Sequence, residues 1–388
     1  MSNLRKAVDD FPALYLFGFL FLYFRSLFSA LSIISIPDFI DKIVFFAGIF
    51  FLCTYIAMKA YIYTKEKVLC CFVILIGLLT YLFSEQTAVF TFCVLIAASY
   101  CVRDIRYVIK IWTFTSIICL SIILVLYGIV YLTDFSLIKI FRRSETDSYA
   151  RYSLFFVSPN MASAFITFII LAVLFLHFSN INFIDYGLSF LLLYIAYLIT
   201  DSKTSFFLGI VGVLLLAIDK KICFAKRKIL YTLTLISPLI QYLLSFFFST
   251  VLYDEKLNQV LTGRLALWRH AFEVYGIKLF GNPFSAMKEK NQQGYVLYFT
   301  TIDSFYVQSI CIFGIVFCLF FLYLYFNTVS LHPHDGSLPL LLVISLFGFS
   351  EVHVLNIFIC FPILILSKGL FKPDQHVAAI GDSQSKIV

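Results

Sequence analysis

Residues 261–284 read LTGRLALWRHAFEVYGIKLFGNPF and, after a further polar run, residues 300–306 read TTIDSFY. Both pieces belong to the longest polar segment in a chain that otherwise consists mostly of apolar stretches. Charged and hydrogen-bonding groups are costly in hydrocarbon unless they are paired. We therefore expect this segment to lie outside a membrane that the rest of the chain crosses, and the contrast between the two decides the fold.

The composition points to the same class of protein. Of the 388 residues, 61% are hydrophobic and 13% are charged, and the mean hydropathy is +0.96. About a quarter of a typical soluble chain is charged. Apolar runs of about 20 residues, each able to cross a bilayer as a helix, recur along the sequence. We attribute the formal charge of +7 to basic residues that set the orientation of the spans, and we do not expect nucleic-acid binding. The ten cysteines lie mostly in apolar runs without a C-x-x-C pair, so no metal site is expected.

We predict an all-α polytopic integral membrane protein with about twelve transmembrane helices, in which residues 1–388 form a single domain. Residues 252–302 are expected to form one large, partly helical extracytoplasmic loop between the ninth and tenth spans. Residues 373–388 are expected to be a short disordered cytoplasmic tail. The predicted spans are approximately 11–35, 39–60, 68–84, 87–102, 108–132, 160–178, 183–199, 204–218, 229–251, 303–326, 338–350 and 354–370.

The basic residues predict the orientation of these spans. Short loops rich in Lys and Arg stay in the cytoplasm. The loops after the even-numbered spans are the basic ones, so both termini are expected to be cytoplasmic. Two long outward loops, 133–159 and 252–302, carry cations that orientation does not explain. The inward basic residues are Lys59, Lys65, Lys67, Arg103, Arg106, Lys110, Lys220, Lys221, Lys226, Arg227, Lys228, Lys368 and Lys372.

The polar segment is predicted to start with a helix over 261–275, for which Thr262 suits the N-cap. Arg264 falls inside the apolar stripe of this helix, whereas Arg269 falls on the opposite face. A cation on a packing face needs an anionic partner. Arg264 is therefore an anion-binding residue, part of a structural ion pair with an outer carboxylate, or an arginine whose stem packs while its charged head extends to water. Arg269 is either a substrate contact or a solvated charge.

Two other outward segments carry cations close to helix starts. Arg151 shortly precedes Pro159 and Asn160, which suit a helix N-terminus, and such termini attract anions. Lys203 lies in the turn TDSKTS, residues 200–205, between the seventh and eighth spans. The simpler alternatives are an interfacial anchor for Arg151, a helix start for Asn160, and an anchoring lysine in a capped turn for Lys203.

Two outer carboxylates and one intramembrane cation complete the candidates. Asp303 lies where the tenth span starts, so it is a base or an N-cap. Glu351 follows an apolar run and is a base, the partner of an arginine, or a solvated residue. Arg25 lies within the first span, so it either has a function or extends outward to the interface.

Six segments are quoted in chain order: Arg151 with Ser158-Pro159-Asn160, T-D-S-K-T-S at 200–205, T-G-R-x-x-x-W at 262–268, L-F-G-N-P-F at 279–284, I-D-S-x-Y at 302–306, and Glu351. Together they cover the chain from about Arg151 to its end. In order and placement they resemble the Wzy-type polysaccharide polymerase and O-antigen ligase family of bacteria.

The resemblance implies a GT-C-class glycosyltransferase in the bacterial cytoplasmic membrane that uses an undecaprenyl-diphosphate-linked oligosaccharide at the outer face. An acceptor hydroxyl of one repeat unit attacks the anomeric carbon of another chain with inversion, and undecaprenyl diphosphate leaves. No metal or other cofactor is implied. The resemblance also implies membrane lipid, a chain-length regulator and a flippase as partners. By motif, Arg151, Lys203 and Arg264 would hold the diphosphate, Asn160, Arg269 and Tyr306 would contact substrate, and Asp303 or Glu351 would be the base.

The sequence departs from the family pattern at two places. Lys203 stands where the family often has arginine, which keeps the charge but loses the bidentate fork. Ile302-Asp303-Ser304 occupies the place where the ligase branch commonly has a histidine, which favours a polymerase over a ligase. Two further alternatives remain. A flippase of the lipid-linked sugar would need ionisable residues through the bilayer, and a membrane scaffold would tolerate exchange of the outer cations.

Overall fold

A computed structural model describes residues 12–60, 64–102, 104–141, 150–221, 224–261, 263–284, 287–290, 296–299, 302–331 and 335–370. These residues are mostly helical. The main helices are α2 (Pro12–Ala30), α3 (Asp38–Ala60), α4 (Thr64–Ser84), α5 (Thr87–Val102), α6 (Ile105–Thr133), α7 (Pro159–Leu176), α8 (Phe183–Thr200), α9 (Lys203–Lys221), α10 (Phe224–Thr250), α14 (Ile315–Ser330) and α15 (Ser337–Ser350).

Six of these helices in the described part are long and apolar enough to cross a bilayer: α2, α3, α6, α7, α8 and α10. The helices α4, α5, α14, α15 and η4 (Phe361–Leu370) are apolar but shorter. This confirms an all-α chain with several membrane-spanning candidates. The number of twelve spans stays a prediction.

Local sequence signals explain where several helices begin. Asp104 accepts hydrogen bonds from the backbone N–H groups of Arg106 and Tyr107 at the start of α6. Ser158 caps α7, and Pro159 occupies its first turn, where no intrahelical donor is needed. Such caps satisfy N–H groups that would otherwise lack partners at the end of a buried helix. They also fix the point at which the chain enters each helix.

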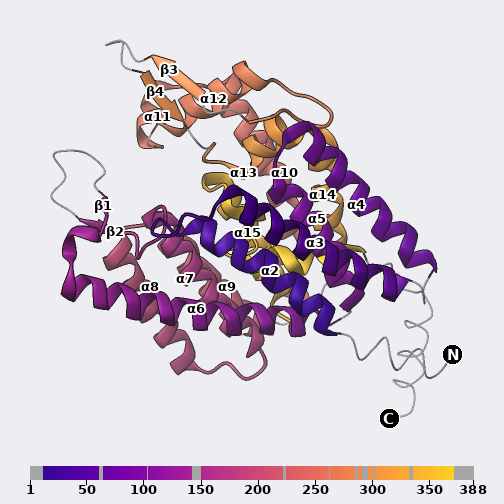
Figure 1. Ribbon diagram of the computed structural model, residues 1–388, viewed down its shortest axis with the longest axis horizontal. Helices are drawn as coiled ribbons and strands as arrows, with labels where there is room; N and C mark the ends of the chain where they lie inside the picture. The colour runs from indigo at the N-terminus through magenta and orange to yellow at the C-terminus, as the bar shows by residue number, and fades with distance from the viewer. Residues whose placement is uncertain are drawn as a thin grey trace.

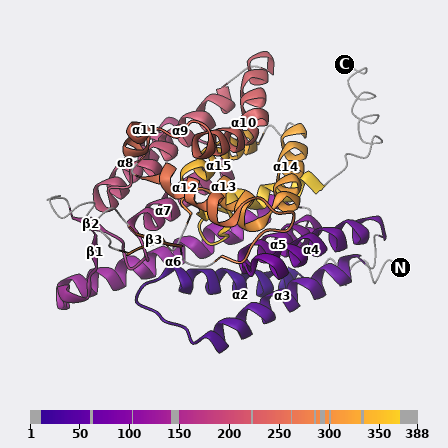
Figure 2. The ribbon, with the colours of Figure 1, turned by 90° about the horizontal axis from the view of Figure 1, so that it is seen from above.

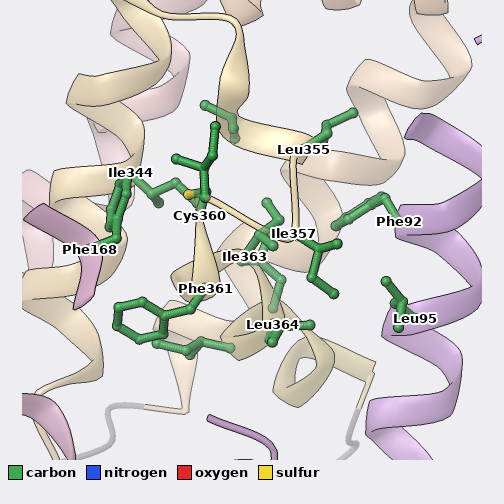
Figure 3. Close-up of a cluster of buried hydrophobic side chains, with 14 of the residues drawn as sticks. Phe92, Leu95, Phe168, Ile344, Leu355, Ile357, Cys360, Phe361, Ile363 and Leu364 are labelled. Atoms are coloured by element: carbon green, nitrogen blue, oxygen red, sulfur yellow. The ribbon is translucent and has the colours of Figure 1, made fainter. Parts of the chain in front are cut away.

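The helices differ in how much of their apolar surface other helices cover. In α7, 78% of the span is buried, whereas in α6 the share is 17%. Figure 2 shows α2 and α3 on one side of the molecule and α9 and α10 on the other, with α7 between them. Around Cys360, side chains from η4, α15, α7 and α5 fill the interior (Figure 3). Trp112 of α6 donates to the carbonyl of Ile357 in this central segment at 2.6 Å.

Two predicted spans are broken in the structure. The tenth, predicted as one helix over 303–326, consists of α13 (Phe305–Gln308), a π-helical turn η2 (Ser309–Phe313) and α14. Backbone of residues 278–282 inserts at the break, where the N–H groups of Ile315 and Val316 donate to the carbonyls of Lys278 and Leu279. The twelfth, predicted over 354–370, consists of the 3₁₀ turn η3 (His353–Leu355) and η4.

Glycine permits the break in the tenth span. A Cβ at Gly281 would lie 1.9 Å from the carbonyl oxygen of Ile312, and one at Gly314 would lie 2.3 Å from the nitrogen of Gly281. Both residues also have positive φ, at 89° and 88°. The side chain of Asn282 fixes the crossing by donating to the carbonyls of Tyr275 and Cys311. The L-F-G-N-P-F segment is thus a packing element.

The two long polar segments contain short structured elements. Between α6 and α7 lie η1 (Phe135–Leu137) and a two-stranded hairpin of β1 (Ile140–Phe141) and β2 (Arg151–Tyr152). Between α10 and α13 lie α11 (Glu255–Val260), α12 (Arg264–Tyr275) and a hairpin of β3 (Met287–Lys290) and β4 (Val296–Phe299). Figure 1 shows α11, α12 and this second hairpin gathered at one end of the molecule.

Candidate functional site

Arg264 is the first residue of α12, and its predicted orientation is confirmed. Leu265, Trp268 and Ala271 of this helix are buried, and the Arg264 side chain on the same side is 18% exposed. The helix starts at Gly263, which has φ of 82° and takes the N-cap position that we predicted for Thr262. Thr262 itself lies outside the described residues. Asn258 of α11 fixes the start of α12 by accepting from the N–H of Ala266.

The partners of Arg264 are the two predicted carboxylates. Its Nη2 lies 3.6 Å from Oε1 of Glu351, and its Nε lies 3.9 Å from Oδ2 of Asp303. Both distances exceed that of a good charge-assisted hydrogen bond. Arg25 is different, because its Nε and Nη2 lie 2.8 and 2.7 Å from the two oxygens of Asp41. The guanidinium of Arg264 is therefore held loosely and can accept a better anionic ligand.

Glu351 stands at the centre of the site. It is the C-cap of α15, and its side chain is 8% exposed, whereas a solvated turn was one of the predicted alternatives. Burial raises the pKa of the Glu351 carboxyl to about 7 from 4.5. The charge of Arg264 opposes this rise of the pKa, that of Asp303 adds to it, and that of Arg151 opposes it. Among the residues that the structure describes, none donates a hydrogen bond to its Oε1.

Arg151 reaches this site from a different part of the chain. The β1–β2 hairpin holds its backbone, with Phe141 opposite Arg151. Its Nη2 donates to Oδ1 of Asn160 at 2.8 Å, and its Nε donates to the carbonyl of Thr200 at 3.1 Å. Asn160, predicted to contact substrate, thus holds Arg151. The charge of Arg151 lowers the pKa of the Glu351 carboxyl, by less than the charge of Arg264 does.

The turn 200–205 takes part through its backbone and Asp201 more than through its lysine. Asp201 has φ of 46°, and its Oδ2 lies 4.0 Å from Nε of Arg151. Lys203 is the first residue of α9, and its side chain is exposed. It forms no ion pair with a carboxylate in the part of the chain that the structure describes. The sequence predicted that this turn contributes to the site but did not single out Thr200 or Asp201.

Asp303 lies at the more open side of the cluster. Its side chain is 45% exposed, against 8% for Glu351. The predicted N-cap role belongs to its neighbour Ser304, whose hydroxyl accepts from the N–H of Val307 at the start of α13. Asp303 is thereby left outside the helix, where it faces Arg264.

Two predicted substrate contacts lie away from the cluster. Arg269 is 50% exposed and forms an i,i+4 ion pair with Glu273 at 3.0 Å. This geometry agrees with the alternative prediction that Arg269 is a solvated charge. Tyr306 is 1% exposed, and its hydroxyl donates to the carbonyl of Ser345 at 2.9 Å. Its ring also packs on Tyr242 at 4.6 Å between centroids. The structure therefore assigns Tyr306 to the core.

The described site residues do not contain a metal-ligand cluster, since no three His, Cys, Asp or Glu side chains gather anywhere in the described part of the chain. The cluster instead combines two arginines with carboxylates that lie 3.6 to 4.0 Å from guanidinium nitrogen atoms. Such an arrangement can bind an anion that is stronger or more highly charged than a carboxylate, and phosphate oxygens match the guanidinium fork well.

Comparisons of this chain with protein-family models, with curated proteins and with solved structures give no match in any of the three. The interpretation of the site therefore depends on its geometry and on the residues themselves.

Proposed function

We propose that the protein is a polysaccharide polymerase that joins undecaprenyl-diphosphate-linked oligosaccharide repeat units at the outer face of the bacterial cytoplasmic membrane. One observation carries the proposal. Arg264 lies 3.6 Å from the buried carboxyl of Glu351, and Arg151, from a polar segment more than a hundred residues away in the sequence, lowers the pKa of that carboxyl. Cations placed at a leaving group stabilise the negative charge that develops on a departing diphosphate.

In the proposed reaction the acceptor hydroxyl oxygen forms a bond to the anomeric carbon of the donor sugar, on the face opposite the diphosphate. The bond from that carbon to the diphosphate oxygen breaks, and its electron pair leaves with the diphosphate. Arg151 and Arg264 stabilise the negative charge that develops there. The configuration at carbon is inverted.

The proton of the acceptor hydroxyl needs a base, and we assign this role to Asp303. A base must reach the hydroxyl directly or through one water. The side chain of Asp303 is 45% exposed, whereas that of Glu351 is 8% exposed. Glu351 then has a positioning role, because it holds Arg264 in place until the diphosphate replaces it.

The finer topology belongs to the same proposal. We propose about twelve spans in a GT-C-like arrangement, with residues 252–302 outside the membrane and both termini in the cytoplasm. The helix ends that carry the site support this arrangement. Arg264 follows α10, Asp303 precedes α13, Glu351 ends α15, and Arg151 precedes α7. The ends that carry Arg264, Asp303 and Glu351 lie together, as the contacts of Arg264 require.

The test is a polymerisation reaction with purified protein in lipid nanodiscs. An undecaprenyl-diphosphate-linked repeat unit is supplied with EDTA, and a ladder of products is expected on a gel. Arg264→Ala should abolish the ladder and Arg264→Lys should weaken it. Arg269→Ala, on the exposed face of the same helix, should leave the ladder unchanged. Translocation of the lipid across vesicles without chain growth would instead indicate a flippase, and transfer to lipid A-core without chain growth would indicate a ligase.

A further inference from the structure

A groove between α2 and α3 is distinct from the polar site. The two helices cross closely where Gly18 and Gly48 face leucines of the partner helix, because a Cβ at either glycine would lie 2.7 Å from a leucine Cγ. From this crossing they separate toward the connection 31–37, as Figure 2 shows. The separation leaves a cavity of about 570 Å³ between them. This volume is in the range of pockets that hold small molecules.

The walls of this α2–α3 groove are almost entirely hydrocarbon. Leu20, Phe24 and Phe28 of α2 face Ile40 and Val44 of α3 across it. Aromatic rings every three or four residues on α2 give a continuous apolar wall along the helix. The groove can therefore take an extended hydrocarbon chain along the direction of the two helices.

The polar residues in the groove are already paired with one another. Arg25 binds Asp41 through two hydrogen bonds of 2.8 and 2.7 Å, and its Nη1 donates to Thr87 of α5 at 3.3 Å. Its guanidinium also stacks 4.7 Å from the ring centroid of Phe45. A cation held in this way by a carboxylate is a poor site for a phosphate. The groove thus suits the chain of a lipid more than its headgroup.

The open end of the groove is connected to the segment that carries Arg151. The last residues of α2 pair with residues 155–157, since Ser32 N donates to Phe155 O at 2.7 Å and Val157 N donates to Ala30 O at 2.9 Å. This strip leads directly from Arg151 to the start of α7. Leu154 and Phe155 within it are buried with φ of 50° and 67°, a conformation that bulky residues adopt only when the surroundings impose it.

We propose that the α2–α3 groove binds the polyprenyl chain of the lipid-linked donor whose diphosphate lies between Arg151 and Arg264. This inference rests on the proposed function and adds where the lipid lies. In this arrangement the isoprenoid chain lies on the aromatic wall of α2. The phosphate end of the lipid passes over the strip that residues 30–32 and 155–157 form. Arg25, paired with Asp41, offers no cation to a phospholipid headgroup at the groove, whereas the strip that leaves the open end of the groove carries Arg151.

The first test measures binding without turnover. The probe is undecaprenyl diphosphate carrying one sugar and a diazirine in its isoprenoid chain, in vesicles of phosphatidylethanolamine and phosphatidylglycerol. After illumination, labelled peptides from α2 and α3 are expected, and unlabelled undecaprenyl diphosphate should displace the probe. Labelling of the groove by a diazirine phospholipid that undecaprenyl diphosphate does not displace would overturn the inference.

The second test narrows the groove. Val44→Trp and Leu20→Trp each place an indole in it, and Phe50→Trp on the exposed side of α3 is the matched control. An indole in the groove occupies the space that the chain would fill, so the chain loses its packing contacts with the aromatic wall. The KM for an undecaprenyl donor should rise at least tenfold in either groove variant, while that for a farnesyl donor, too short to fill the groove, should stay unchanged.

The two proposals fail in different ways. Polymer formation by the wild type, with no labelling of α2 or α3 and no effect of either groove variant, would refute the groove and leave the proposed function standing. Labelling of the groove by the polyprenyl probe, with no polymer or transfer product under any condition, would refute the proposed function and leave the chain-binding groove.

Discussion

Glu351→Gln removes one ionisable group from the centre of the site and should change how stability depends on pH. In the folded protein the pKa of Glu351 is raised to about 7 from 4.5, because burial disfavours the charged form more than Arg264 favours it. Each unit of pKa difference between the folded and unfolded states corresponds to about 1.4 kcal/mol. Ionisation of Glu351 therefore costs the folded state about 3 kcal/mol once the pH exceeds 7.

The sign follows from linkage. A carboxyl whose pKa is higher in the folded state contributes stability that is fully present below pH 4.5 and is lost as the pH rises through 7. Glutamine mimics the protonated carboxyl and does not ionise. The variant should match the wild type near pH 4.5 and be more stable than it by about 3 kcal/mol at pH 8.

The measurement is thermal unfolding of both proteins in detergent between pH 4.5 and 8.5. The midpoint of the wild type should fall relative to that of the variant across this range, by several degrees at pH 8. Arg264→Ala is a second arm, since loss of its charge should raise the pKa of Glu351 further and move the fall to higher pH. If the unfolding midpoints of the wild type and Glu351→Gln change with pH in parallel, the conclusion that burial raises the pKa of Glu351 is refuted.

Three other predictions concern the anion site, a buried ion pair and the break of the tenth span. Between pH 8 and 6, binding of inorganic diphosphate to the wild type should take up more protons than binding to Glu351→Gln, seen by calorimetry in buffers of different ionisation enthalpy, because an anion beside Glu351 raises its pKa further. Equal proton uptake by the two proteins would contradict the shared site. Arg227→Met should destabilise the protein by about 3–5 kcal/mol, because the fully buried carboxylate of Asp219, which lies 2.8 Å from Arg227, then loses its cation. Adding Asp219→Asn should restore part of the lost stability in a thermal unfolding scan. Gly314→Ala should prevent folded protein from accumulating on size-exclusion chromatography, whereas Gly128→Ala, which meets nothing within 4 Å, should not.

Hydropathy and helical periodicity predicted much of the fold and one side of the site. Lipid-facing and core helices are apolar for different reasons, but both appear in the sequence as long apolar runs. The periodicity of α12 placed Arg264 on the packing face and Arg269 on the exposed face, and both placements are confirmed. The reason is local: side chains three and four residues apart share a face whatever the rest of the chain does.

The parts that depend on contacts between distant segments could not be predicted. No sequence signal shows that Asn160 and the carbonyl of Thr200 hold Arg151, or that Glu351 is buried. The break of the tenth span is caused by backbone of residues 278–282, which a pattern confined to residues 303–326 does not contain. The glycines at 281 and 314 were a signal for this contact. Both must lack a side chain for the two backbone segments to cross, so neither glycine alone indicates the crossing.

The ion pairs of this protein separate into tight and loose ones, and the difference indicates what each cation does. Arg25 and Arg227 lie 2.7–2.8 Å from their carboxylates, and a substitute anion would have to break short hydrogen bonds. Arg264 lies 3.6 and 3.9 Å from two carboxylates that share its charge, and one of these has a pKa of about 7. Protonation of Glu351 near neutral pH lowers the cost of exchanging it for another ligand. A diphosphate offers more charge and more acceptor oxygens than either carboxylate, so Arg264 can exchange partners during a reaction while Arg25 and Arg227 keep theirs.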